Sequence, residues 1–215
     1  MKITIKTTSK PVKLIGLTGP YCAGKNHIAL LLEQRGLPVL DVDKLGHQVI
    51  ETEKERLAAR FGEDILDSDG KVNRKRLGAR VFGKPGELAA LEDIIHPGAN
   101  RETLDWIQRQ SRQEKACVIN AALLHRTAVF EALDAIILVQ ATFLTRLLRA
   151  KRRDRLPWTV ILKRFRSQRK FTSQYFMGKA DIYRVENSGF FGFRSGSLRG
   201  KLENRINEIL PLMGI

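Results

Sequence analysis

Gly19-Pro20-Tyr21-Cys22-Ala23-Gly24-Lys25-Asn26 is the stretch that decides how this chain folds. It follows the apolar run Leu14 to Leu17 and precedes a second apolar run, Ile28 to Leu32. This order predicts a strand, a glycine turn and a helix. Because glycine adopts backbone angles that other residues resist, Gly19 and Gly24 permit a tight turn. The amides of the turn and of the helix N-terminus then point at one anion.

The spacing of this turn matches the phosphate-binding loop pattern G-x-x-x-x-G-K-[ST] except at its last position, Asn26. Lys25 adds a mobile positive charge for the outer phosphates of ATP, and the whole turn is expected to contact them. A hydroxyl at the last position normally binds Mg²⁺. The amide oxygen of Asn26 could bind the ion or orient a metal-bound water. The alternative is an ordinary glycine turn between a strand and a helix.

The composition of the chain favours a globular protein with anionic partners. Its 215 residues suit one α/β domain with insertions or two small domains. The net charge of +15 favours nucleotides, nucleic acid or an acidic membrane surface. Two cysteines, Cys22 and Cys117, do not make a disulfide framework. The run Ala135 to Val139 is too short to span a bilayer and residues 1–13 lack a signal peptide's apolar stretch, so a cytoplasmic location is expected.

Hydrophobic runs and turn signals predict an α/β fold with a parallel central sheet flanked by helices. The expected strands are 12–18, 38–40, 116–119, 135–139 and an edge strand at 182–185. The expected helices are 25–35, 44–61, 74–82, 87–95, 99–112, 142–170 with a break before Pro157, and 202–210. Residues 1–11 are expected to be flexible and residues 192–200 to form a loop.

Two carboxylates, Asp41 and Asp43, follow the second expected strand. Ligands of open α/β sheets bind beyond the carboxyl ends of the strands, so this pair and the glycine turn are expected to face one crevice. On one extended segment the two side chains would point to the same side. The alternative is that one of them caps the helix that starts near Lys44.

A set of short pieces, in their order and spacing, resembles the dephospho-coenzyme A kinase family over roughly residues 13–210. The distance from the glycine turn to Asp43 is particularly specific. The pieces are Gly16-Leu17-Thr18-Gly19, Gly24-Lys25, Asp41-Val42-Asp43, His47, Phe61-Gly62, Asp64-Ile65-Leu66, Asp69-Gly70, Asn73-Arg74, Leu77, Val81-Phe82, His96-Pro97, Arg149, Arg153-Asp154, Arg164, Gln168, Ala180-Asp181 and Asn187-Ser188-Gly189.

The resemblance implies a P-loop kinase that uses ATP and Mg²⁺ to phosphorylate the 3′-hydroxyl of the ribose of dephospho-coenzyme A, the last step of coenzyme A synthesis. It implies a nucleotide-binding core (12–43, 112–141 and 171–215), a helical acceptor-binding insertion (44–111) and a basic helical lid (142–170). ATP and dephospho-coenzyme A are the expected partners. A membrane and nucleic acid are not expected, and the oligomeric state stays open.

Phosphoryl transfer needs positioning and positive charge, and a carboxylate at the acceptor hydroxyl to receive its proton. The resemblance makes Asp43 the candidate base, with Lys25 as the second catalytic residue. The candidate acceptor-binding residues are Asp41, Asp43, His47, Arg74 and His96. The candidate ATP contacts outside the turn are Arg149, Arg153 and Asn187.

Each of these assignments competes with a purely structural role. His47 would share a helical face with Asp43, four residues before it, or would simply be solvated. His96 would sit near the end of a helix, where a positive group interacts well with the dipole. Arg149 and Arg153 share a helical face and carry guanidinium groups that match phosphate oxygens. Several of the lid's many remaining basic residues would only form a solvated face.

Three residues depart from the family pattern. Asn26 replaces a hydroxyl, and Asn120 and Arg126 replace two acids after the third strand. These changes remove negative charge from the expected metal region and leave an attenuated enzyme as an option. A different small-molecule P-loop kinase and a basic nucleic-acid-binding protein also stay open as interpretations. Charge favours the nucleic-acid binder, whereas the lack of an interleaved aromatic platform opposes it.

Overall fold

The computed structural model describes residues 12–168, 175, 179–189 and 195–215. The predicted flexible N-terminus, 1–11, and the remaining parts of the lid and of the C-terminal loop lie outside the described residues. The chain divides into two compact units. The first unit comprises Met1–Leu40 and Ile107–Ile215, and the second unit comprises Asp41–Trp106.

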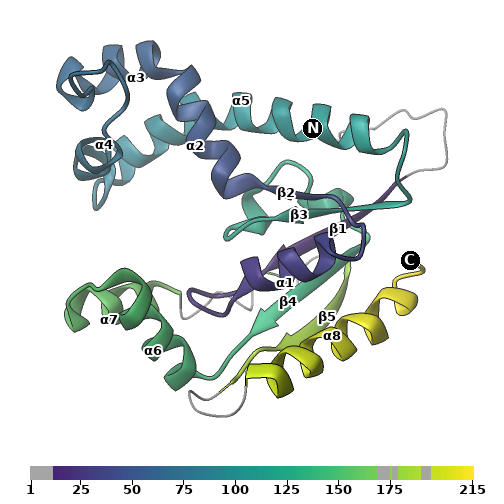
Figure 1. Cartoon of the computed structure of the whole chain (residues 1–215). Coiled ribbons are helices and arrows are strands. Elements are labelled where there is room, and N and C mark those ends of the chain that lie inside the picture. The colour runs from purple at the N-terminus through teal and green to yellow at the C-terminus, as the bar shows by residue number, and fades with distance from the viewer. Residues whose placement is uncertain (1–11, 169–174, 176–178, 190–194) are drawn as a thin grey trace. The chain divides into compact units, whose positions relative to one another are not determined.

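The first unit is built on a five-stranded parallel sheet in the order β2-β3-β1-β4-β5 (Figure 1). The strands are β1 (Lys13–Thr18), β2 (Val39–Asp41), β3 (Ala116–Asn120), β4 (Ala135–Gln140) and β5 (Asp181–Glu186). Strand β1 is central, because Ile15 is in register with Val118 of β3 and with Ala135 of β4. The predicted α/β fold with a parallel sheet is therefore confirmed, and the expected edge strand pairs in parallel with β4.

Strand β1 is buried on both faces. On one face, α1 (Lys25–Glu33) and α8 (Ser195–Leu212) pack in the hydrophobic cluster that contains Ile15 (Figure 1). On the other face, a Cβ atom on Gly16 would lie 2.5 Å from Leu124 Cδ2. Strands covered on both faces have continuous apolar sequences, which explains the unbroken run before the glycine turn.

The second unit is helical. Its elements are α2 (Val42–Thr52), α3 (Lys54–Phe61), the short 3₁₀ helix η1 (Glu63–Ile65), α4 (Arg74–Val81) and α5 (Pro85–Gln110). The last residues of α5, from Ile107, belong to the first unit. The single helix expected over 44–61 is thus two helices, because the backbone of Glu53 leaves the helical region. A small core that includes Leu57, Ile65 and Leu77 holds these helices together.

Helix α5 corrects another prediction, because it continues through Pro97 where two helices were expected. A proline inside a helix lacks one backbone donor and crowds the carbonyl four residues earlier. A proline in the sequence therefore predicts that a helix ends there. Packing outweighs that cost here. Leu91 and Ile94 pack against the core of the second unit, and beyond the proline the buried Thr103 hydroxyl donates to the Ala99 carbonyl at 2.7 Å.

The C-terminal helix α8 begins at Ser195, so the expectation of a loop over 195–200 is wrong. The two glycines in this short stretch weaken the helical signal of the sequence. Farther along α8, Leu202, Ile206 and Ile209 are buried in the core of the first unit. Their packing stabilises a helix that starts earlier than propensity alone indicates.

The described part of the predicted lid, which is called the lid below, forms two helices, α6 (Phe143–Asp154) and α7 (Trp158–Ser167). Pro157 lies directly before α7, as predicted. The two helices pack through Ala150 and Phe165, which belong to one small apolar cluster. Two more 3₁₀ helices, η2 (Leu124–Arg126) and η3 (Phe130–Ala132), connect β3 to β4.

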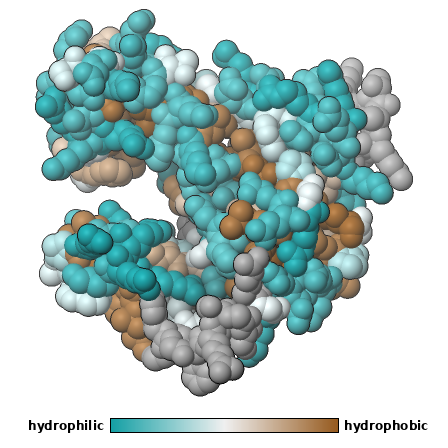
Figure 2. All heavy atoms as spheres, viewed as in Figure 1, coloured by the Kyte–Doolittle hydropathy of each residue, from teal (hydrophilic) through white to brown (hydrophobic). Residues whose placement is uncertain are grey.

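The described segments contain no helix long and apolar enough to cross a bilayer. Figure 2 shows one face of the protein, on which hydrophobic residues form separate areas among more extensive hydrophilic ones.

Two neighbouring leucines of α1 test the packing of the sheet. Leu31 is 1% exposed and Leu30 is 48% exposed. We expect Leu31→Ala to lower the free energy of unfolding of the first unit by about 2–5 kcal/mol, because it leaves a cavity in the core. Leu30→Ala is the matched control and should change it by about 0.5 kcal/mol or less. Urea denaturation followed by circular dichroism measures both, and equal losses would contradict the packing described here.

Candidate active site

The glycine turn connects β1 to α1 and has the backbone of a phosphate cradle. Cys22 and Gly24 have φ angles of 61° and 95°, which lie in the left-handed region. The Ala23 amide donates to the Pro20 carbonyl at 2.9 Å, closing the turn. No side chain caps the N-terminus of α1, and its first turn contains no acidic residue. The N-terminus of α1 therefore suits an anion, which is the role expected from the sequence.

Two glycines of the turn have no room for a side chain. A Cβ atom on Gly19 would lie 2.6 Å from the carbonyl oxygen of Val139 in β4. A Cβ atom on Gly24 would collide with the side-chain amide of Asn187, which follows β5. The glycines thus allow both the turn and its close contact with the neighbouring strand ends.

Asn187 and Arg149 bind the backbone of the turn through hydrogen bonds. The Asn187 side-chain amide, on a residue only 3% exposed, donates to the Ala23 carbonyl at 2.8 Å. Arg149 donates to the same carbonyl and to Asn187 Oδ1, both at 3.3 Å. Burial lowers the pKa of the Arg149 guanidinium. The structure therefore brings together two predicted ATP contacts, from α6 and from the end of β5, at one carbonyl of the turn.

Lys25 lies at the start of α1 beside two asparagines. Its Nζ donates to Asn120 Oδ1 at 3.1 Å and to Asn26 Oδ1 at 3.2 Å. The Asn120 amide also donates to Asn26 Oδ1 at 3.3 Å, and Asn120 is only 2% exposed. Both departures from the family pattern at these positions thus place neutral amides around the lysine ammonium group. Arg126, the third departure, lies in η2.

The other turn residues, Tyr21 and Cys22, contact the lid. Burial raises the pKa of the Cys22 thiol, and both Cys22 and Cys117 are free thiols. Tyr21 lies beside Arg153 of α6, whose guanidinium carbon is 5.2 Å from the centre of the tyrosine ring. The predicted ATP contact Arg153 is thus held against the turn.

Four residues that were not predicted as site residues also contact the turn or its neighbours: Arg146 and Asp154 of α6, Arg164 of α7, and Gln168 directly after α7. A helical pattern could have identified Arg146, because it lies three and seven residues before the two predicted arginines and shares their face. The contacts of the other three depend on the folded arrangement of the lid.

The candidate acceptor residues all lie in the second unit. Asp41 ends β2 and caps α2, because its carboxylate accepts from the Lys44 amide at 3.1 Å. The capping alternative therefore holds for Asp41. Asp43 lies in the first turn of α2 and not on an extended segment with Asp41, so the expectation of a shared strand face is wrong. Asp43 and His47 are both exposed and lie four residues apart on α2, as predicted.

The remaining two acceptor candidates lie on separate helices. Arg74 is exposed at the first position of α4, directly after the capping residue Asn73. His96 is exposed in the middle of α5 and not at a helix end, so the proposed interaction with a helix dipole is wrong.

Comparison with known proteins identifies the family. The model of the dephospho-CoA kinase family matches residues 13–189. A dephospho-CoA kinase of Treponema denticola is 34% identical over 214 residues, which cover 95% of this chain and 93% of that protein. The chain belongs to the dephospho-CoA kinase family. The predicted family and the kinase class are therefore confirmed.

Solved structures share the fold of this chain. A crystal structure described as TT1252 from Thermus thermophilus has a TM-score of 0.77 and 28% identity, covering 94% of this chain and 98% of that chain. A dephospho-CoA kinase from Campylobacter jejuni has a TM-score of 0.61 and 22% identity, covering 93% and 98%. The similarity to the second structure shows the fold, which is that of P-loop kinases.

The kinase family uses ATP, which is commonly bound together with a magnesium ion. Mg²⁺ prefers oxygen ligands, commonly one or two carboxylates together with substrate phosphates. Around Lys25 the side-chain oxygens are those of Asn26 and Asn120, which are neutral and already accept hydrogen bonds. Within the described part of the chain, no three His, Cys, Asp or Glu side chains lie together as a metal site. The two amide oxygens therefore fit Mg²⁺ only as neutral ligands, and the charged ligands would have to come from nucleotide phosphates.

Two glycines with positive φ test the close contact of the turn. Gly24→Ala should raise the Kd for ATP about tenfold or more, because the new methyl displaces Asn187. Gly36→Ala is the matched control, since Gly36 also has a positive φ, of 80°, but nothing lies within 4 Å of its Cβ position. Both variants should lose about 1–2 kcal/mol of stability from backbone strain. Titration calorimetry with ATP would refute this account if the two variants bound ATP equally well.

Proposed function

We propose that this chain transfers the γ-phosphoryl group of ATP to the 3′-hydroxyl of the ribose of dephospho-CoA, the last step of coenzyme A biosynthesis. The observation that carries this proposal is the family match over residues 13–189. The uncapped, positively charged turn at the N-terminus of α1 supports it, because it suits a polyphosphate.

On the donor side, the amides of the turn and Lys25 hold the β- and γ-phosphates. Arg149 and Arg153 of the lid add guanidinium groups on the same face of α6, four residues apart. The transition state of phosphoryl transfer spreads negative charge over the transferred oxygens, so fixed positive groups stabilise it. We assign the lid to 142–170 and the nucleotide core to 12–43, 112–141 and 171–215.

On the acceptor side, we assign residues 44–111 to binding dephospho-CoA. Asp43 accepts the proton of the ribose hydroxyl, and its exposed position on α2 leaves it accessible to a substrate. His47, one turn along the same helix, and Arg74 and His96 are exposed side chains suited to the acceptor's phosphates. Asp41 has the separate role of capping α2.

Magnesium enters this proposal with ATP. Asn26, the residue after Lys25, would hold the ion directly or through a water, and Asn120 would lie beside it. When bound, the ion neutralises charge on the phosphates. The protein itself contributes the surrounding positive groups and the neutral amides.

A kinase assay with ATP and Mg²⁺ over an acceptor panel tests the proposed function. The panel holds dephospho-CoA, adenosine, nucleoside monophosphates and pantothenate. We expect the highest kcat/KM with dephospho-CoA. A much higher kcat/KM for another member would favour a different small-molecule kinase. Salt-sensitive binding of RNA, without phosphorylation of any acceptor, would favour the nucleic-acid-binding alternative.

Asp43 is tested by replacing its carboxylate with an amide of the same shape. Asp43→Asn should lower kcat on the order of 10²-fold, because it removes the proton acceptor. The Kd for ATP should stay the same, since the glycine turn is untouched. Asp41→Asn is the matched control, because asparagine caps a helix as well as aspartate does. Wild-type turnover by Asp43→Asn would exclude Asp43 as the base.

Asn120 is tested by restoring the acid expected from the family pattern. Asn120→Asp should lower the concentration of divalent metal needed to saturate the complex, because Mg²⁺ and Mn²⁺ prefer anionic oxygens. Electron paramagnetic resonance of Mn²⁺ with a non-hydrolysable ATP analogue measures this affinity without turnover. Asn73→Asp, at the cap of α4, is the control. An unchanged Mn²⁺ affinity would place Asn120 outside the metal's surroundings.

A further inference from the structure

The lid binds every polar group of Tyr21, which lies inside the glycine turn. The Tyr21 amide donates to Gln168 Oε1 at 2.7 Å, and its carbonyl accepts from Arg146 Nε at 2.8 Å. Its hydroxyl donates to Asp154 and accepts from Arg164 Nη1, the second at 3.3 Å. A residue of the turn is thus bound at its amide, carbonyl and hydroxyl by α6, by α7 and by Gln168 directly after α7.

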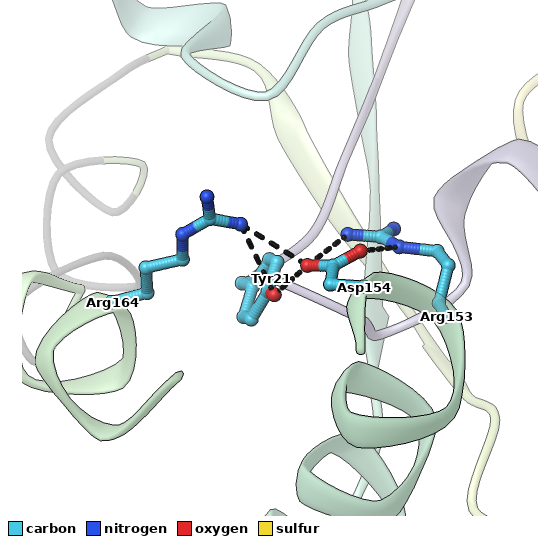
Figure 3. A network of polar contacts seen from close by, with 4 residues as sticks. All are labelled: Tyr21, Arg153, Asp154 and Arg164. Carbon is cyan, nitrogen blue, oxygen red and sulfur yellow. Dashed lines mark hydrogen bonds and ion pairs between the residues drawn. The ribbon is translucent and has the colours of Figure 1, made fainter. Parts of the chain in front are cut away.

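The ring of Tyr21 also contacts two lid arginines. The guanidinium carbon of Arg153 lies 5.2 Å from the ring centre, and that of Arg164 lies 5.6 Å from it. Both distances are typical of cation–π interactions. The edge-to-face contact with Phe165, at 5.5 Å between ring centres, orients the ring. Figure 3 shows Arg153 and Arg164 approaching Asp154 from opposite sides, with Tyr21 between them.

Asp154 is the one acidic residue in the sequence from 143 to 168, among nine basic residues. Its carboxylate accepts from Arg153 Nε at 2.7 Å and from Arg164 Nη1 at 3.1 Å. The bond from Arg153 lowers the pKa of Asp154, and burial, followed by the bond to Asp154, raises the pKa of Tyr21. At neutral pH the carboxylate is therefore ionised and the phenol stays protonated as a donor.

We propose that Tyr21 is a positioning residue that, together with Asp154, holds Arg153 and Arg164 ready beside the glycine turn before ATP binds. The proposal rests on the function proposed above, in which lid arginines contact ATP. An arginine side chain loses considerable rotamer entropy when it is ordered. Contacts that order two arginines in advance remove that cost from the binding of ATP. Tyr21 is well placed for this, because it belongs to the turn that holds the phosphates.

The experiment compares Tyr21→Leu, Tyr21→Phe and the matched control Tyr183→Phe in the full-length chain. Tyr21→Leu loses the ring and the hydroxyl, whereas Tyr21→Phe keeps the ring under both guanidinium groups. Tyr183→Phe removes another tyrosine hydroxyl, which donates to the Leu212 carbonyl at 3.3 Å, away from the lid. The readouts are the KM values for ATP and dephospho-CoA, the Kd for ATP, and hydrogen–deuterium exchange of residues 143–168 without nucleotide.

We expect Tyr21→Leu to raise the KM and Kd for ATP about tenfold, with Tyr21→Phe intermediate and Tyr183→Phe unchanged. The KM for dephospho-CoA should not change, whereas general damage to the fold would move both KM values. Amide exchange of α6 and α7 should become faster in Tyr21→Leu and stay the same in α1. Unchanged ATP affinity or unchanged lid exchange in Tyr21→Leu would overturn the proposal.

The test still decides the role of Tyr21 if Tyr21→Leu does not fold or if the wild-type chain is inactive. If Tyr21→Leu does not fold, Asp154→Asn replaces it, because that change breaks both ion pairs and leaves the turn intact. Asp154→Asn should also raise the Kd for ATP, and an unchanged value would overturn the proposal. If the wild-type chain does not phosphorylate dephospho-CoA, the proposed function fails, whereas the Kd for ATP and the lid exchange still decide the role of Tyr21.

Discussion

The backbone of the glycine turn lies very close to residues at the ends of β4 and β5, and the rest of the site depends on this close contact. Gly24 adopts a left-handed backbone angle against the side chain of Asn187, and Gly19 lies against the Val139 carbonyl. A side chain at either glycine would push the turn away from the ends of β4 and β5. The central position of β1 in the sheet brings these strand ends close enough to support the turn.

The lid is attached to this turn through arginines that lie near a single carboxylate. The nine basic residues in 143–168 would repel one another, and Asp154 offsets this repulsion where Arg153 and Arg164 meet. Arg149 instead donates hydrogen bonds to the backbone carbonyl of Ala23 in the turn and to the side-chain oxygen of Asn187. The lid's positive charge is thus organised by specific acceptors and is not only a solvated basic surface.

The neutral pair Asn26 and Asn120 changes the electrostatics at Lys25. A buried carboxylate at position 120 would hold the ammonium group tightly as an ion pair, whereas two amide oxygens hold it by weaker hydrogen bonds. Less negative charge also means less attraction for a divalent ion before the nucleotide arrives. Both asparagines lie within residues 13–189, which the model of the dephospho-CoA kinase family matches.

Local patterns in the sequence by themselves predicted the strands, the glycine turn, the shared helix of Asp43 and His47, and the basic helices α6 and α7. These features depend on residue spacing over a few positions, which a sequence displays directly. Only the tertiary structure decided that α5 continues through Pro97, since packing outweighs a local break signal. It also decided that Asn187 supports Ala23 and that Asp154 binds Tyr21, across 164 and 133 residues of chain. Such contacts form only when the sheet brings segments that are far apart in the sequence close together in space. A pattern over a few neighbouring residues does not contain that information.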